Sequence, residues 1–318
     1  MSSEQFLRLQ SGYSIPKIGL GTWAAPPGVI ERVIKDAVDV GYRHLDMAYY
    51  YGNQAEIGGT LRSLMANSVV KREDLFLTSR VWNTHHSYKQ ALENVDICLS
   101  ELNVDYLDLC LIHWPFGWKE DSGTLEPMDS NGNMLRSDVD YLETWSALED
   151  AVKAGKVRSI GLSNFNSEQV GRVVKNAKIQ PVTNQVECHP YLNQQKLKDY
   201  CEKFNIYLSA YAPFTSPNQN IYRSDADPNV LEDPVIKRIA ADINKSVGQV
   251  LLRWAAQRNT IAVPKSTNKE RLRQNLNIWD FKLTAEQMSH IDALDRNHRI
   301  NTYALEKSHP HYPFSAEF

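Results

Sequence analysis

Eight short segments with strand-like composition alternate with helical patterns along the chain, and this alternation limits the possible folds more than any other feature. Several are continuous apolar runs, which is typical of strands covered on both faces. Strands that alternate with helices pair in parallel through right-handed crossovers. Eight such units predict a closed (β/α)8 barrel, with an open, doubly wound sheet as the alternative. The expected strands span residues 17–22, 42–48, 75–81, 106–114, 159–165, 182–188, 207–213 and 260–266.

Amphipathic helices are expected in the connections, because apolar residues recur there at helical spacing. These segments are 29–38, 87–99, 139–154, 167–176, 193–204, 235–243, 246–257, 269–277 and 284–294. An open sheet would more often carry a G-x-G-x-x-G pattern in its first turn, and the sequence has none. The barrel is therefore the favoured architecture.

Three further segments complete the expected architecture. Residues 6–9 and 15–18 flank a polar turn and predict a hairpin that plugs one end of the barrel. The longest polar insertion, 116–138, follows the fourth strand, and the segment from Arg296 onward has no clear periodicity. We expect one domain over residues 1–318, a (β/α)8 TIM barrel with an N-terminal β-hairpin plug, two extra helices and a C-terminal loop.

Composition excludes several classes of protein. Hydrophobic residues make up 42% of the chain, which suits a globular core, and no apolar run reaches the ~18 residues of a membrane span. The net charge of -3 lacks the basic excess of nucleic-acid-binding proteins. None of the four cysteines forms a C-x-x-C pair, and the N-terminal residues do not resemble a secretory signal. We expect a cytoplasmic protein that binds neither nucleic acid nor membrane.

Polar and aromatic residues collect where the predicted strands end, and these ends share one face of a barrel, where barrel enzymes build their sites. Singly, Asp46 could cap a helix, Tyr51 could pack in the core, and Arg80 could form a surface ion pair. His113 could equally be a core histidine. Together they suit proton delivery to an oxygen, because a cation beside a tyrosine lowers the pKa of its phenol. The set is Trp23, Asp46, Tyr50, Tyr51, Arg80, Trp82, His113, Trp114, Ser163, Asn164, Gln185, His189, Tyr211, Lys265 and Ser266.

Other catalytic patterns are missing from the sequence. The pairs His85-His86 and His309-x-His311 lack the neighbouring carboxylates or cysteines of a metal site, so we expect no bound metal. The sequence has no G-x-S-x-G nucleophile motif and no Walker loop. A barrel hydrolase is disfavoured, because no paired carboxylates stand among these strand-end residues.

Three stretches of the chain resemble the aldo-keto reductase family. They are residues 41–58, which read GYRHLDMAYYYGNQAEIG, residues 156–165, and residues 261–266 followed by Arg271 and Asn275. The resemblance runs from about residue 6 onward. The segment around Tyr312 and the long insertion after His113 are most similar to the animal aldose reductase and aldehyde reductase branch.

The resemblance implies a monomeric barrel enzyme that uses NADPH to reduce an aldehyde or ketone to an alcohol by direct hydride transfer. The family's catalytic Asp–Tyr–Lys–His tetrad maps onto Asp46, Tyr51 and His113, with Arg80 at the lysine position. Tyr51 would protonate the forming alkoxide, and His113 would orient the carbonyl. Arg80 and Asp46 would tune the tyrosine. An arginine keeps the charge but is larger, planar and bidentate. The sequence therefore leaves open an NADP(H)-binding homologue with little turnover that acts as a sensor or structural partner.

The resemblance also implies which residues bind the cofactor. Ser163, Asn164 and Gln185 would hydrogen-bond the nicotinamide carboxamide. Lys265 and Arg271 suit a 2′-phosphate and so favour NADPH over NADH, although a surface turn with solvated charges would look the same. The cofactor residues are Gly21, Thr22, Trp23, Asp46, Ser163, Asn164, Gln185, Tyr211, Phe214, Thr215, Ser216, Lys265, Ser266, Asn268, Arg271, Gln274 and Asn275.

An aromatic pocket is expected for a small-molecule carbonyl substrate, because tryptophans at strand ends suit the walls of a ligand site. Trp118 is a further candidate for this wall. Ile221 stands near a position where the branch has a tryptophan, which leaves the substrate open. The substrate residues are Trp23, Tyr50, Trp82, His113, Trp114, Asn301 and Tyr303.

Overall fold

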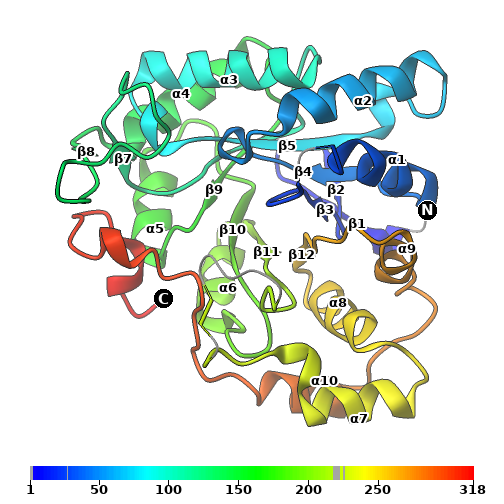
Figure 1. Cartoon of the computed structure of the whole chain (residues 1–318). Coiled ribbons are helices and arrows are strands. Elements are labelled where there is room, and N and C mark those ends of the chain that lie inside the picture. Colours follow the sequence, from blue (N-terminus) through cyan, green and yellow to red (C-terminus); the bar gives the residue numbers. More distant parts are fainter. Residues whose placement is uncertain (1–2, 27, 218–222, 225) are drawn as a thin grey trace.

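Eight parallel strands lie in the middle of the molecule and helices surround them (Figure 1). The computed structural model describes residues 3–26, 28–217, 223–224 and 226–318. The strands are hydrogen-bonded in the order β3-β4-β5-β6-β9-β10-β11-β12. A parallel bridge between Ile18 and Ala262 joins the two edges, so the sheet closes into the predicted (β/α)8 barrel. The strands are β3 (Leu20–Gly21), β4 (His44–Asp46), β5 (Phe76–Val81), β6 (Leu109–Ile112), β9 (Ile160–Ser163), β10 (Thr183–Glu187), β11 (Tyr207–Tyr211) and β12 (Ile261–Ala262).

Close packing at the closing edge explains Gly21. A Cβ atom at this position would lie 2.7 Å from the carbonyl oxygen of Val263, so a side chain would push β3 away from the segment after β12. The Gly21 N–H donates to Pro264 O at 3.0 Å across the same gap. A glycine is needed here because the two backbones approach each other directly.

Helices cover the outside of the barrel, and each predicted helix is present, α5 with the predicted bounds and the others with shifted ends. They are α1 (Ile30–Val40), α2 (Gln54–Ala66), α3 (Tyr88–Leu102), α4 (Tyr141–Lys153), α5 (Ser167–Asn176), α6 (Gln195–Glu202), α7 (Pro234–Asp242), α8 (Val247–Gln257), α9 (Lys269–Leu276) and α10 (Ala285–Asp292). The short 3-10 helices are η1 (Ser3–Gln5), η2 (Tyr49–Tyr51), η3 (Arg72–Asp74), η4 (Asn83–His85), η5 (Val230–Glu232), η6 (Ala304–Glu306) and η7 (Pro313–Ser315).

Helix α2 is absent from the sequence-based prediction. Its buried face includes Gln54, Gly58 and Thr60, so hydrophobic periodicity is weak there. Gly58 packs directly against the backbone of Glu101 in α3. The small residue Gly58 thus lets α2 pack closely on α3. The apolar pattern that usually predicts a packed helix is weak in this segment.

The N-terminal hairpin closes one end of the barrel, as predicted. Strands β1 (Phe6–Arg8) and β2 (Ser14–Pro16) pair antiparallel. Leu7 and Ile15 pack in one buried cluster with Phe76 and Leu109, which begin β5 and β6. The plug therefore lies at the N-terminal ends of the strands and leaves the opposite ends for a site.

Part of the insertion after β6 is buried, although its composition is mostly polar. It contains the antiparallel pair β7 (Gly117–Trp118) and β8 (Arg136–Ser137). Phe116 and Trp118 are fully buried and form a separate, aromatic cluster with Trp82 and Trp114. The C-terminal segment runs beside this insertion (Figure 1).

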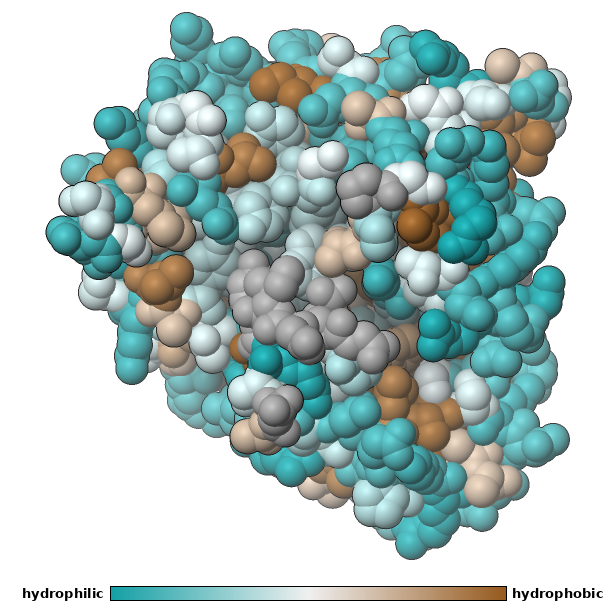
Figure 2. All heavy atoms as spheres, in the orientation of Figure 1, coloured by the Kyte–Doolittle hydropathy of each residue, from teal (hydrophilic) through white to brown (hydrophobic). Residues whose placement is uncertain are grey.

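The visible surface is mostly hydrophilic, and hydrophobic residues are scattered over the face shown in Figure 2. Within the described ranges, no helix has both the length and the apolar character needed to cross a bilayer.

Candidate active site

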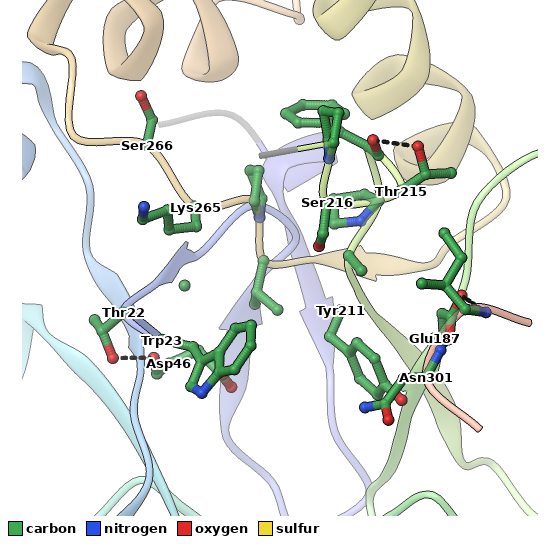
Figure 3. Close-up of a pocket in the computed structure, with 18 of the residues that line it drawn as sticks. Thr22, Trp23, Asp46, Glu187, Tyr211, Thr215, Ser216, Lys265, Ser266 and Asn301 are labelled. Atoms are coloured by element: carbon green, nitrogen blue, oxygen red, sulfur yellow. Dashed lines mark hydrogen bonds between the residues drawn. The ribbon is translucent and has the colours of Figure 1, made fainter. Parts of the chain in front are cut away.

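A cavity of ≈ 540 Å³ opens at the C-terminal ends of the barrel strands. Residues that end or follow all eight strands line it, together with three from the C-terminal segment, and Figure 3 shows part of this lining. The structure therefore brings together most of the predicted site. These predicted residues line the cavity: Gly21, Thr22, Trp23, Asp46, Tyr50, Tyr51, Arg80, Trp82, His113, Trp114, Ser163, Asn164, Tyr211, Phe214, Thr215, Ser216, Lys265, Ser266, Arg271, Gln274, Asn275, Asn301 and Tyr303.

Arg80, Asp46 and Gln185 form a closed, buried ring of hydrogen bonds at one end of the cavity. Arg80 Nη2 donates to Asp46 Oδ1 at 2.5 Å, and Arg80 Nη1 donates to Gln185 Oε1 at 2.9 Å. Gln185 Nε2 donates to Asp46 Oδ2 at 2.8 Å. Asp46 pairs with Thr78 on the neighbouring strand, and Arg80 lies two residues further along the same face. The register between β4 and β5 therefore places Asp46 and Arg80 close enough to form an ion pair.

Tyr51 stands beside this ring. It ends η2, which directly follows β4, and its hydroxyl oxygen lies 3.4 Å from Arg80 Nη1. Burial alone would lower the pKa of Arg80, but the negative charge of Asp46 outweighs it and the pKa is raised. The guanidinium is therefore a permanent positive charge next to the phenol.

His113 is the fourth member of the group, with its ring centroid 6.1 Å from that of Tyr51. Burial and the positive charge of Arg80 hold the pKa of His113 well below the ordinary histidine value. The imidazole is therefore neutral around pH 7, and its single N–H can donate a hydrogen bond to an oxygen without adding a positive charge.

Aromatic side chains form the wall next to this group. The rings of Tyr50 and Trp82 are stacked with centroids 3.9 Å apart. Residues of the insertion hold both rings, because Tyr50 Oη donates to Glu126 Oε1 at 2.6 Å and Trp82 Nε1 donates to Leu125 O at 2.8 Å. Trp118, a further candidate for this wall, lies outside the cavity lining. It is buried behind the wall.

The middle of the cavity is fixed by side-chain hydrogen bonds. Tyr211 Oη donates to Asn164 Oδ1 at 2.9 Å, and Asn164 Nδ2 donates to His113 O at 3.0 Å. Trp23 and Tyr211 lie on opposite sides of the space (Figure 3). Gln185, predicted to contact a nicotinamide, lies outside the lining, with its amide engaged in the Arg80 ring.

The far end of the cavity is cationic. Lys265 and Arg271 are exposed, and within the described chain neither forms an ion pair. Partial burial and repulsion by Arg271 lower the pKa of Lys265. Asn268 does not line the cavity, because its side chain caps α9 by accepting from the Arg271 N–H at 2.9 Å. Two cations that repel each other form a suitable site for an anion.

Several lining residues were not predicted. Glu187 lies two residues after Gln185 on the same face of β10, so strand periodicity could have indicated it. The others follow from how loops fold, and no local pattern marks them: Ala212, Pro213, Pro217, Arg223, Leu231, Ser246, Val247, Gly248, Val263, Pro264, Thr267 and Ile300. Ile221 lies outside the described residues. Among the residues described, no group of three or more histidine, cysteine or acidic side chains could hold a metal ion.

Comparison with known proteins decides the family, because the model of the aldo/keto reductase family matches residues 17–296. The chain belongs to the aldo/keto reductase family. This is a family of oxidoreductases that act on carbonyl groups. The chain is 42% identical to aldo-keto reductase family 1 member A1 of Gallus gallus over 98% of this chain and 97% of that protein. It is 39% identical to rho crystallin of Aquarana catesbeiana over 100% of this chain and 99% of that protein.

A solved structure shows the same fold. The aldose reductase from Schistosoma japonicum superimposes with a TM-score of 0.92 at 38% identity and covers 98% of this chain and 99% of that chain. The two chains therefore share one fold over almost their whole lengths.

Proposed function

We propose that this aldo/keto reductase reduces aldehydes or ketones to alcohols with NADPH, and that Tyr51 is its general acid. The observation that carries the proposal is the contact of 3.4 Å between the Tyr51 hydroxyl and the buried, charged guanidinium of Arg80. A neighbouring positive charge favours the phenolate and so makes the phenol a better proton donor. The contact lies in the wall of the cavity, where a small substrate can reach it.

The donor set of the cavity fits NADPH. Lys265 and Arg271 would hold the 2′-phosphate, because two cations suit a dianion that NADH lacks. Thr215 and Ser216 would contact the pyrophosphate, and Tyr211 would lie against the nicotinamide ring. When bound, the reduced nicotinamide supplies a hydride to the carbonyl carbon.

The residues at the reaction end would then handle the carbonyl oxygen. Tyr51 and His113 would both donate hydrogen bonds to it, and the Tyr51 proton would move to the oxygen as negative charge develops there. Arg80 would stabilise the phenolate that remains, and Asp46 keeps Arg80 in place. The stacked Tyr50 and Trp82 rings would exclude water from the same space.

An absorbance assay tests this proposal. Purified protein is mixed with NADPH and a panel of aromatic and aliphatic aldehydes, and we expect loss of NADPH absorbance that requires both protein and aldehyde. A parallel series with NADH should show a weaker response at the same nucleotide concentration. If no aldehyde or ketone of the panel gave such a loss, the proposal would fail.

A second candidate is an NADP(H)-binding protein with little turnover. The observation that favours it is that Arg80 Nη1 lies closer to Gln185 Oε1, at 2.9 Å, than to the Tyr51 hydroxyl, at 3.4 Å. Part of the arginine's hydrogen-bonding capacity is thus directed away from the tyrosine. Replacement of Arg80 by lysine separates the two candidates. A gain in turnover in Arg80→Lys supports the second candidate, and a loss supports a working arginine.

A further inference from the structure

Glu187 joins the barrel to the C-terminal segment inside the cavity wall. It is the last residue of β10 and is fully buried. Its Oε1 accepts from the Ile300 N–H at 2.9 Å, and its Oε2 accepts from the Asn301 N–H at 2.8 Å. Its Oε1 is also hydrogen-bonded with His189 Nε2 at 2.9 Å. One carboxylate therefore holds two consecutive backbone N–H groups of a segment more than a hundred residues away in sequence.

The carboxylate is ionised at neutral pH. Burial alone would raise the pKa of Glu187, but the hydrogen bond with His189, the positive charge of Arg299 and the hydrogen bond from the Ile300 N–H outweigh it, and the pKa is lowered. Hydrogen bonds to an ionised acceptor are stronger than those between neutral groups. Figure 3 shows Glu187 and Asn301 side by side, next to Tyr211. The contact is therefore part of the site and not of a distant surface.

The segment that Glu187 holds carries Tyr303 in a strained backbone conformation. Tyr303 has φ of 45°, in the left-handed region that aromatic residues rarely adopt. Its ring packs against Trp114 with centroids 4.8 Å apart, and both rings line the cavity. Strain of this kind persists only where surrounding contacts hold it, and it is concentrated at functional sites.

Residues 300–306 are also held in the middle and at their other end. Glu306, also buried, accepts from Trp118 Nε1 at 3.0 Å and from Arg136 Nε at 2.8 Å. Tyr312 Oη donates to Thr302 O at 2.6 Å. Residues 300–306 are thus held by a buried carboxylate at each end, and the aromatic ring of Tyr303 stands between them.

We propose that Glu187 is a positioning residue that fixes the substrate wall made by Asn301 and Tyr303, and that this wall selects flat aromatic carbonyl compounds over small aliphatic ones. The selectivity rests on the proposed function. The preference follows from the lining, because the Tyr50–Trp82 stack and the Trp114–Tyr303 pair present aromatic surface to the substrate. A planar ring gains stacking contacts from such surfaces that a short alkyl chain lacks.

Glu187→Gln tests the proposal, because the amide has nearly the same shape but offers an NH2 group where the carboxylate offers a second acceptor. Asp108→Asn is the matched control. Asp108 is a buried carboxylate before β6, at the opposite end of the barrel. It accepts from Arg72 and from the Leu77 N–H at 2.8 and 2.9 Å. Both substitutions remove one buried charge, but only Glu187 contacts the segment that carries Asn301 and Tyr303.

Two readouts are measured in the full-length protein with NADPH present. By hydrogen–deuterium exchange, we expect the amides of residues 300–303 to exchange about tenfold faster or more in Glu187→Gln, as the loss of a hydrogen bond to a charged group predicts. We expect the ratio of kcat/KM for benzaldehyde to that for propanal to fall about tenfold, mainly through KM for benzaldehyde. Asp108→Asn should change neither quantity.

Unchanged exchange at residues 300–303 in Glu187→Gln would overturn the proposal. Faster exchange with an unchanged ratio would overturn the selective role of the wall. If Glu187→Gln does not fold, Tyr312→Phe removes only the hydrogen bond to Thr302, and it should move both readouts in the same direction by a smaller factor. A wild-type protein that reduces neither aldehyde would overturn the proposed function and the selectivity. The exchange comparison would still decide whether Glu187 holds the segment.

Discussion

The two ends of the cavity are built in opposite ways. At the reaction end, Arg80, Asp46 and Gln185 are buried and satisfy one another's hydrogen bonds. At the far end, Lys265 and Arg271 are exposed and repel each other. The first arrangement is preorganised, so it needs no rearrangement when charge develops on a substrate. The second becomes favourable only when an anion binds. The difference implies that rate and nucleotide affinity depend on separate residues.

The largest effect is expected from Tyr51→Phe, which removes only the hydroxyl at the reaction end. We expect kcat to fall by about 10²–10⁴, the usual contribution of a positioned general acid, while NADPH affinity stays close to that of the wild type. Initial rates and a fluorescence titration with NADPH measure the two quantities. A variant that keeps its rate but loses NADPH affinity would reverse the roles of the two ends.

Acid should destabilise the folded protein through two buried histidines that lie outside both ends of the cavity. Burial lowers the pKa of His44 from 6.5 to about 4 and that of His86 to about 3. Between these values and 6.5 the unfolded chain binds more protons than the folded chain, so the free energy of unfolding falls as pH falls. The shift of His44 alone corresponds to about 3 kcal/mol, present at neutral pH and lost as pH falls toward 4.

Denaturant unfolding at neutral pH and near pH 4 measures this loss. His86→Leu should flatten the pH dependence, because neither ring nitrogen of His86 has a hydrogen-bond partner among the described residues and the leucine does not titrate. Lys265→Met, at the exposed end, should leave the pH profile as it is. An unfolding free energy that stays constant over this range would show that these histidines are not buried as the structure has them.

Loss of a cation at the far end should affect nucleotide affinity more than rate. We expect Lys265→Ala or Arg271→Ala to raise the Kd for NADPH about 10–100-fold, since each removes a charge-assisted hydrogen bond, and to change the Kd for NADH much less. The rate at saturating NADPH should stay close to that of the wild type. Titrations with both nucleotides measure the difference, and an equal loss for NADH would show that these residues do not contact the 2′-phosphate.

The smallest effect is expected from Gln185→Leu, because Arg80 keeps its ion pair with Asp46. One buried N–H of Arg80 loses its acceptor, which costs about 1–3 kcal/mol of stability and allows the guanidinium to shift. We expect a lower kcat and a shifted pH–rate profile with little change in NADPH affinity. Ser209→Ala, which removes only the hydroxyl bonded to the same amide, is the control. A large rise in the Kd for NADPH would instead support the nicotinamide contact that the sequence predicts.

The fold could be predicted largely from local patterns. Each barrel strand falls inside a predicted segment, because alternation of strands and helices is encoded over short stretches of chain. The candidate site followed from the same pattern, since a parallel barrel brings all strand ends to one face. Helix α2 was missed because its buried residues, such as Gln54 and Thr60, are polar.

Contacts between residues far apart in the sequence could not be predicted. The Arg80–Gln185 hydrogen bond joins residues 105 positions apart, and the Glu187–Ile300 contact joins residues 113 positions apart. Neither residue spacing nor composition indicates such pairs. The insertion shows the same limit, because Phe116 and Trp118 stand in a segment of polar composition and become core residues only when the C-terminal segment covers them.

The central claim is that the preorganised group of Tyr51, Arg80, Asp46 and His113 reduces a carbonyl carbon with NADPH. Isotope transfer tests it most directly. The protein is incubated with NADPH carrying deuterium at both positions of the nicotinamide C4 and with benzaldehyde, and the alcohol is analysed by mass spectrometry. We predict benzyl alcohol with one deuterium on the carbinol carbon, formed by the wild type and lost in Tyr51→Phe. Alcohol without deuterium, or no alcohol from the wild type, would contradict the account.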